Sequence, residues 1–186
     1  MQIDQSAGSR WFVVPDGYYF HQGHGWIRPE AGQIVRVGLD DFAQRLLGRP
    51  NAIQLPRIGQ RLQLGERAWA VTVDATLLTM LSPVEGKVVA INRTLRDTPE
   101  LVNADPYGAG WLLEVRVVRP KTALKNLMSG ALAASWMEQA TERVRAMCNG
   151  QLGMVLPDGG EPIPGFICAV APDEWAAAAR AFLLTD

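Results

Sequence analysis

Two histidines separated by two residues are the first candidates for chemistry in this chain of 186 residues. His21 and His24, together with Cys148 and Cys168, would offer nitrogen and sulfur donors to a zinc ion. A zinc site needs three or four such donors around one metal, and closely spaced cysteine pairs usually provide them. The two cysteines here form no close pair, so we predict no metal site. The pattern favours buried thiols.

A nucleophile activated by a histidine is the second kind of chemistry to consider. Asp40, Asp41 and Asp74 could orient His21 or His24 as a general base. The sequence contains no Gly-x-Ser-x-Gly elbow, phosphate-binding loop or paired acidic motif that would organise these residues into a site. We therefore predict no catalytic residues and a protein that is not an enzyme.

Lysine is the third reactive residue type, and it is scarce. The chain has three lysines, Lys87, Lys121 and Lys125, against fifteen arginines. An uncharged lysine amine on an exposed turn can be acylated. Lys87 begins an apolar run through Ile91 that is typical of a strand, and the other two lysines lie in the connection to the last helices. None of the three is expected at the tip of a hairpin.

The composition limits the classes of function. Nearly half of the residues, 48%, are hydrophobic, which is enough for one sizeable core. A net charge of -1 with mixed signs along the chain gives no basic stripe, and we therefore predict no binding to nucleic acid or to a membrane surface. No run approaches the ~18 apolar residues of a membrane span, and residues 1–10 lack the apolar centre of a signal peptide. We expect a cytoplasmic protein.

The elements that would position these residues are mostly short strands. Val35, Val37 and Leu39 alternate with polar or small neighbours, which is the period of a half-buried strand. Asp40 should cap a short helix that ends at Gly48, and a second short helix is expected at residues 99–102. Seven segments have strand chemistry: 24–28, 34–37, 52–55, 68–73, 76–81, 88–91 and 112–118. Many short strands predict a mainly β fold, a sandwich or barrel.

The strand pattern stops near Pro120, which divides the chain into a β-sandwich domain at residues 1–120 and a helical extension at 121–186. Ser129 should open a long helix that stops at Asn149 and Gly150, and Pro172 suits the start of a final helix ending near Leu183. We expect Trp136, Trp175 and Phe182 to be buried between these helices or against the sandwich. The long helix should bury one face, formed by Leu132, Trp136, Ala140, Val144 and Met147.

The most specific segment is residues 97–111. Asp and Asn side chains cap turns there, prolines preset the backbone, and Gly108 and Gly110 could adopt positive φ. The whole segment can be explained as one specified loop, and an additional role in a docking surface stays open. Four further motifs accompany it: His24-Gly25-Trp26, Val37-Gly38-Leu39-Asp40, Leu55-Pro56 and Ser82-Pro83-Val84-Glu85-Gly86.

On these motifs, residues 18–120 resemble the H protein of the glycine cleavage system, a small carrier whose lysine holds a lipoyl arm. The resemblance implies a lipoyl-domain-like β-sandwich (barrel-sandwich hybrid) with small helices and a projecting hairpin. The family's modified lysine lies eight residues before the proline of the Pro-Val-x-Gly turn. Counting back from Pro83 gives Ala75, and Thr72 replaces the glutamate that the family has three residues earlier. Alanine cannot be acylated, so we predict no lipoyl cofactor.

The sequence therefore predicts a non-lipoylated H-protein-like adaptor that acts through protein–protein interaction. Its partners would be proteins, with glycine-cleavage-type or lipoate-attaching enzymes as candidates. Two alternatives stay open: a lipoyl carrier modified at a displaced lysine such as Lys87, and a metal-binding or hydrolytic domain that uses His21, His24 and a cysteine. The hairpin has an apolar run in which one face could form a contact patch: Leu77, Leu78, Met80 and Leu81.

Overall fold

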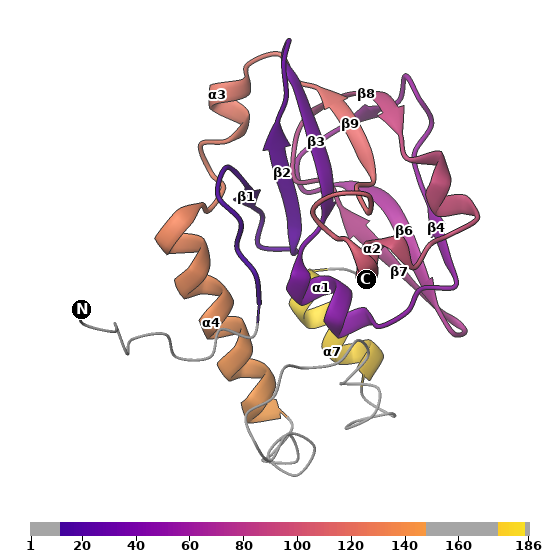
Figure 1. Cartoon of the computed structure of the whole chain (residues 1–186), viewed down its shortest axis with the longest axis vertical. Helices are drawn as coiled ribbons and strands as arrows, with labels where there is room; N and C mark the ends of the chain where they lie inside the picture. Colours follow the sequence, from indigo (N-terminus) through magenta and orange to yellow (C-terminus); the bar gives the residue numbers. More distant parts are fainter. Residues whose placement is uncertain (1–11, 148–174, 185–186) are drawn as a thin grey trace, which may run out of the picture.

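A computed structural model describes residues 12–147 and 175–184 of the chain, and it has two antiparallel sheets at its centre (Figure 1). The larger sheet has the strand order β1-β2-β3-β9-β8-β5, and the smaller sheet has the order β4-β6-β7. The strands are β1 Tyr19–Phe20, β2 Gly25–Pro29, β3 Ile34–Leu39, β4 Ala52–Gln54, β5 Arg61–Leu62, β6 Arg67–Val73, β7 Thr76–Leu81, β8 Gly86–Ile91 and β9 Leu113–Arg116. Alternate residues of both sheets are buried in a common core.

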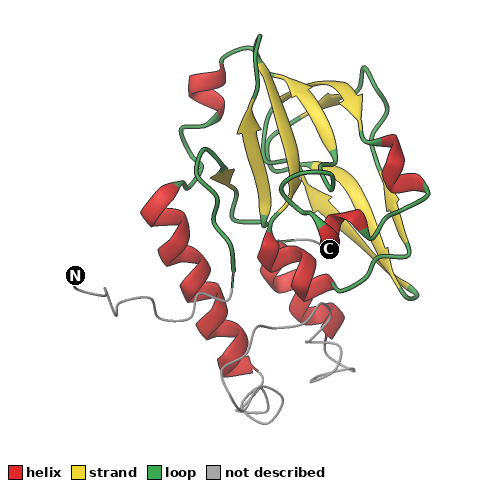
Figure 2. Cartoon of the chain, in the orientation of Figure 1, coloured by secondary structure: helices red, strands yellow, loops and turns green. Residues whose placement is uncertain are grey.

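Helices cover one end and one side of the sandwich (Figure 2). The long helix α4 runs beside the β1 edge, whereas α7 lies next to α1 and contacts β7. The helical elements are α1 Asp41–Leu47, the 3-10 helix η1 Arg93–Arg96, α2 Leu101–Ala104, α3 Pro120–Ala123, α4 Gly130–Met147 and α7 Trp175–Leu183. In the described ranges, no helix combines the length and the apolar character needed to cross a bilayer.

All seven predicted strands are present, and their ends differ from the prediction by at most two residues. The two-residue strands β1 and β5 were not predicted, because two residues show no periodicity. The short helix expected at 99–102 is α2, two residues further along, and η1 precedes it. The mainly β, lipoyl-domain-like sandwich with small helices is confirmed.

Helix α1 has the predicted caps. The Asp40 carboxylate accepts a hydrogen bond from the Ala43 backbone N–H at 2.7 Å. At the other end, Gly48 has φ +76°, a left-handed conformation that favours glycine, and its N–H donates to the carbonyl of Gln44. The buried side of α1 includes Phe42 and Leu46.

The predicted buried face of α4 is partly wrong. Leu132 is 65% exposed, and Trp136 is half-buried. The buried stripe is Ala133, Met137, Ala140 and Val144. Two adjacent faces of this helix carry apolar residues, and periodicity alone does not decide which of them meets the sandwich. The Met147 side chain, the expected stop at Asn149 and Gly150, and the expected start at Pro172 lie outside what the structure describes.

The segments beyond Pro120 pack onto the sandwich. Met128 exchanges two backbone hydrogen bonds with Phe20 of β1, at 2.8 and 3.0 Å. On α7, Phe182 and Leu183 are 5% and 0% exposed, and the Phe182 ring lies 5.3 Å from that of Phe42. Burial of Phe182 is confirmed, whereas Trp136 and Trp175 are half-buried. The described parts of the extension therefore share one core with the sandwich.

Candidate functional site

The hairpin of β6 and β7 is the first candidate site. The pairing of Val73 with Thr76 leaves a turn of two residues, Asp74 and Ala75, and both are exposed. Asp74 takes the left-handed conformation with φ +50°, and its N–H donates to the Asn51 side chain next to β4. The structure thus places Ala75 at a solvent-facing hairpin tip, which we call the attachment turn (Asp74 and Ala75). Its correspondence to the family's lysine stays a prediction.

The strands below the attachment turn bury one face and expose part of the other. Leu78 and Met80 are both 0% exposed, whereas Leu77 is 48% exposed and Leu81 is half-buried. This is the alternation expected of a half-buried strand. Thr72 is half-buried and lies opposite Leu77. Leu77 is therefore an apolar side chain that the hairpin exposes to solvent.

The three lysines lie away from this hairpin. Lys87 is in β8, as predicted, and is exposed between its strand neighbours Arg61 and Arg116. Lys121 is in α3, and Lys125 follows that helix. All three belong to described segments, and none lies in a hairpin turn.

His24 is a buried structural residue. Its Nδ1 lies 2.8 Å from Asp40 Oδ2, and both side chains are 0% exposed. The imidazole is stacked between the rings of Phe42 and Trp136, with centroids at 4.2 and 4.4 Å. Its Nε2 is buried without a hydrogen-bond partner among the described residues. A substrate cannot reach this ring, so the His24–Asp40 pair supports the fold rather than acid–base chemistry.

His21 and the remaining acidic residues do not complete a site. His21 Nδ1 accepts a hydrogen bond from the Gly23 N–H at 3.0 Å. Burial lowers the pKa of His21, and the neighbouring His24 lowers it further. The Asp41 carboxylate accepts hydrogen bonds from the Val13 N–H and the Gln44 side chain, and Asp74 lies in the hairpin turn. Within residues 12–147 and 175–184, no three His, Cys, Asp or Glu side chains are grouped to hold a metal. Cys148 and Cys168 lie outside the described residues.

Tyr107, in the loop 97–111, holds α1 in place. Its hydroxyl donates to the Val13 carbonyl at 2.7 Å and accepts from the Asp41 N–H at 3.0 Å. Burial raises the pKa of this hydroxyl above its usual range, and the charge of Asp40 contributes. His24, Asp40, Asp41, Phe42 and Tyr107 form a cluster that we call the α1 anchor. Sequence reasoning identified the loop but not the role of Tyr107, whose partners are far away in sequence.

The glycines of this loop serve a different purpose from the predicted one. Neither Gly108 nor Gly110 has positive φ. A Cβ at Gly110 would lie 2.5 Å from the Leu101 carbonyl oxygen, so the residue is small because backbone segments approach closely. Asn103 donates to the carbonyls of Gln44 and Gly48, both at 3.0 Å, which ties the loop to α1. These contacts explain the residues of the loop by their role in the fold, and an additional role in docking stays open.

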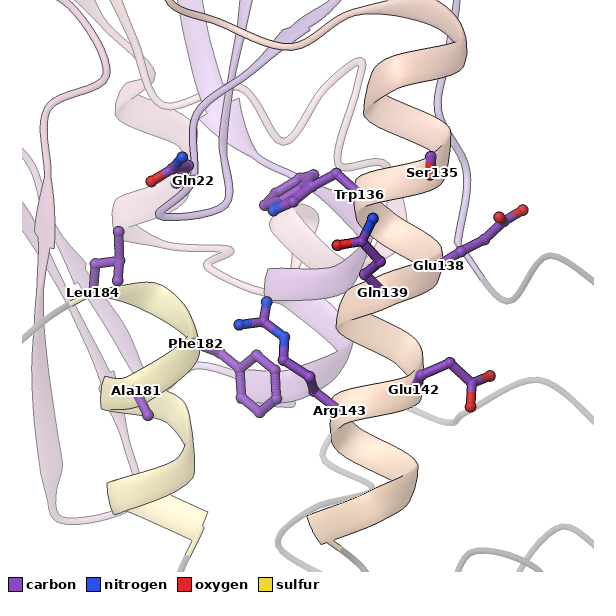
Figure 3. A pocket seen from close by; sticks show the side chains of 10 residues that line it. All are labelled: Gln22, Ser135, Trp136, Glu138, Gln139, Glu142, Arg143, Ala181, Phe182 and Leu184. Atoms are coloured by element: carbon purple, nitrogen blue, oxygen red, sulfur yellow. The ribbon is translucent and has the colours of Figure 1, made fainter.

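A pocket of about 690 Å³ lies between α4 and α7 (Figure 3). Trp136 and Phe182 line it from the two helices, and the Arg143 guanidinium lies 5.1 Å from the centre of the Phe182 ring. In Figure 3 the Glu138 and Glu142 side chains point away from α7. The lining provides two aromatic rings, the cation of Arg143 and the carboxylates of Glu138 and Glu142.

The two sheets, the projecting hairpin and the capped α1 define a lipoyl-domain-like β-sandwich protein. The family model described as glycine cleavage H-protein matches residues 18–140, which is well over half of the chain. The chain belongs to this family. The match continues past Pro120 into α4, whereas α7 lies beyond it.

Individual relatives agree with the family match. The glycine cleavage system H protein of Mycobacterium avium (strain 104) is 40% identical over 121 residues, which cover 65% of this chain and 91% of the relative. That of Mycobacterium leprae (strain TN) is 43% identical over 104 residues, with 56% and 79% covered. The crystal structure of a glycine cleavage system H protein from Mycobacterium marinum has a TM-score of 0.58 and 30% identity, and covers 68% of this chain and 99% of that chain.

Proposed function

We propose that this protein is a non-lipoylated member of the glycine cleavage H-protein family and acts as a protein-interaction adaptor. The observation that carries the proposal is the exposed attachment turn, where Ala75 stands at the position that we assign to the family's lysine. A lipoyl arm is attached by acylation of a primary amine. The attachment turn has no primary amine, so the protein would keep the fold of the carrier without the lipoyl group.

The strongest alternative is a carrier modified at Lys87. This side chain is exposed, and an exposed amine is accessible to an acylating enzyme. However, Lys87 is held in β8 between β5 and β9, and two cationic residues lie directly opposite it. A ligase that recognises a hairpin turn would meet a flat, positively charged sheet. We therefore favour the adaptor, without catalytic activity of its own and located in the cytoplasm.

The candidate partners are the enzymes that H proteins meet: those of the glycine cleavage system and those that attach lipoate. Leu77 on the hairpin provides an exposed apolar contact for such a partner. Helix α7 lies beyond the family match and contacts both α1 and β7. It changes the surface next to the hairpin, so the set of partners would differ from that of a protein without this helix.

An intact-mass measurement on protein purified from its native host tests the absence of the lipoyl group. We expect the mass of the unmodified chain. A lipoyl increment on the peptide that contains Lys87 would establish the carrier instead.

A gain-of-function variant tests the assignment of the attachment turn. We expect Ala75→Lys to accept lipoate from a lipoate ligase at least weakly, and more strongly when Thr72→Glu rebuilds the acidic neighbour. Ala75→Arg is the matched control, because it adds the same charge without an amine that can be acylated. If the folded double variant accepts no lipoate, the turn does not correspond to the family's attachment site.

Competition tests the adaptor role. If the docking surface is retained, the purified protein should inhibit a reconstituted glycine cleavage reaction by competing with a lipoylated H protein. Leu77→Ser should weaken this inhibition, whereas Leu132→Ser, which changes an exposed leucine of α4 away from the hairpin, should not. Absence of inhibition at large excess would exclude these enzymes as partners.

A further inference from the structure

Three cationic side chains form a row across neighbouring strands of the larger sheet. Arg61 of β5 lies directly opposite Lys87 of β8, which in turn lies directly opposite Arg116 of β9. Residues opposite each other in antiparallel strands point to the same face. All three are exposed, whereas their neighbours in the strands, Leu62, Val88 and Val115, are buried in the core. We call Arg61, Lys87 and Arg116 the cationic row.

The described residues give the cationic row no ion-pair partner. Like charges placed directly opposite each other on a sheet repel and cost stability. Among the described residues, no carboxylate lies within 4.0 Å of any of the three side chains. Within residues 12–147 and 175–184, the fold therefore tolerates this repulsion without a counterion.

The same sheet shows how opposed cations are neutralised elsewhere. Arg28 of β2 lies directly opposite Arg36 of β3. Arg28 forms an ion pair with Glu30 at 2.6 Å, and Arg36 forms one with Glu114 at 2.7 Å. Carboxylates at the corresponding places beside the cationic row would remove its repulsion. Their absence indicates that the positive charge is available to another molecule.

Two exposed apolar residues lie before and after β5, the strand that carries Arg61. Ile58 and Leu64, on either side of β5, are 52% and 50% exposed. The Gly59 N–H donates to the Val88 carbonyl at 2.8 Å, so the loop that carries Ile58 lies against β8. β5 is the edge strand of its sheet, and a partner can approach it from the side. Apolar contacts together with arginines are typical of protein interfaces.

We infer that the cationic row, with Ile58 and Leu64, is a docking surface for an acidic helix of a partner protein. Adjacent strands are ~4.8 Å apart, and acidic side chains at i and i+4 on a helix are about 5–6 Å apart. Such a helix can therefore lie across the strands with one carboxylate near each cation, while its apolar residues meet Ile58 and Leu64. Nucleic acid fits less well, because the row is short and the whole chain carries a net charge of -1.

This surface is on the sheet that does not contain the hairpin, so it is independent of the attachment turn. Its probe is a fluorescent helical peptide with glutamates at i, i+4 and i+8 and leucines beside them. Binding is measured by anisotropy at low and at high salt. We expect the affinity for the peptide to fall as the salt concentration rises. In the triple variant Arg61→Gln, Lys87→Gln, Arg116→Gln, the affinity should fall at least about tenfold.

The matched control removes three other exposed cations in the variant Arg93→Gln, Arg96→Gln, Lys121→Gln. It should change the affinity by less than about threefold. The row variant should also melt at the same or a higher temperature than the wild type, because its repulsion is gone. Equal losses in the two triple variants, no binding of the peptide, or a melting temperature lowered by the row variant would overturn the inference. Tighter binding of a DNA oligonucleotide of equal charge would overturn it as well.

Discussion

The α1 anchor and the attachment turn differ in how deeply their residues are buried and in how many contacts these residues make. In the α1 anchor, His24 and Asp40 are 0% exposed, and Tyr107 joins two segments of backbone by hydrogen bonds from one hydroxyl. In the attachment turn, Asp74 and Ala75 are exposed and close a hairpin whose strands are intact. The first region maintains the fold, and the second is the position that we propose for the family's chemistry.

The difference teaches that the fold and the proposed attachment position depend on separate residues. A buried residue of the α1 anchor cannot change without leaving a partner unsatisfied or a cavity behind. An exposed turn residue can change at almost no cost in stability. The family's geometry would therefore persist after the loss of the lysine that we propose, and the substitutions below measure that contrast.

Asp40→Ala should have the largest effect. It removes the partner of the buried His24 and the side-chain cap of α1 at once. We expect the free energy of unfolding to fall by about 3–5 kcal/mol, measured by urea denaturation. The control Asp16→Ala changes an exposed aspartate and should stay within about 0.5 kcal/mol. An Asp40→Ala protein as stable as this control would show that the α1 anchor does not support the fold.

Trp136→Ala should have the next largest effect. Its indole stacks on His24 from α4 and is half-buried. We expect a loss of roughly 2 kcal/mol in the same assay, less than for a fully buried tryptophan. Leu132→Ala, one helical turn earlier and 65% exposed, is the control and should have little effect. Equal losses of stability in the two variants would mean that the Trp136 side chain of α4 does not stabilise the α1 anchor.

Tyr107→Phe should cost about 1–2 kcal/mol, because it leaves the buried Asp41 N–H without its acceptor. Tyr19→Phe is the control, since the Tyr19 hydroxyl makes no hydrogen bond with a described residue. The predicted pattern would be contradicted if both variants lost the same stability.

The same residue predicts a dependence on pH. The pKa of Tyr107 is raised in the folded state above the value of about 10 in the unfolded state. Below pH 10 both states keep the proton, and this stabilisation is fully present. As the pH rises above 10, the unfolded state loses the proton first, so stability should fall. The fall should be smaller in Tyr107→Phe, and unfolding curves between about pH 9 and 11 would show a difference.

The sequence allowed prediction where the determining contacts are local. Strand β7 was predicted with both ends correct, and the caps of α1 follow from Asp40 and Gly48, which adjoin the helix. The cationic row could not be predicted, because it depends on the register among β5, β8 and β9. The stacking of Trp136 on His24 likewise joins residues more than a hundred positions apart. Leu132 was misplaced because the choice between two apolar faces is made by tertiary packing.

Ala75→Lys should have the smallest effect and is the sharpest test of the contrast. Ala75 is exposed and does not have positive φ, so a lysine can take its backbone conformation with the side chain in water. The free energy of unfolding should change by less than about 0.5 kcal/mol. Leu78→Lys, in the same hairpin but at a site that is 0% exposed, should cost several kcal/mol, because it buries an ammonium group without a partner. A large loss for Ala75→Lys would place Ala75 in a packed environment and remove the basis for assigning it to the family's attachment position. A small loss would show that the fold accommodates a lysine at position 75, so that the hairpin itself does not require the alanine.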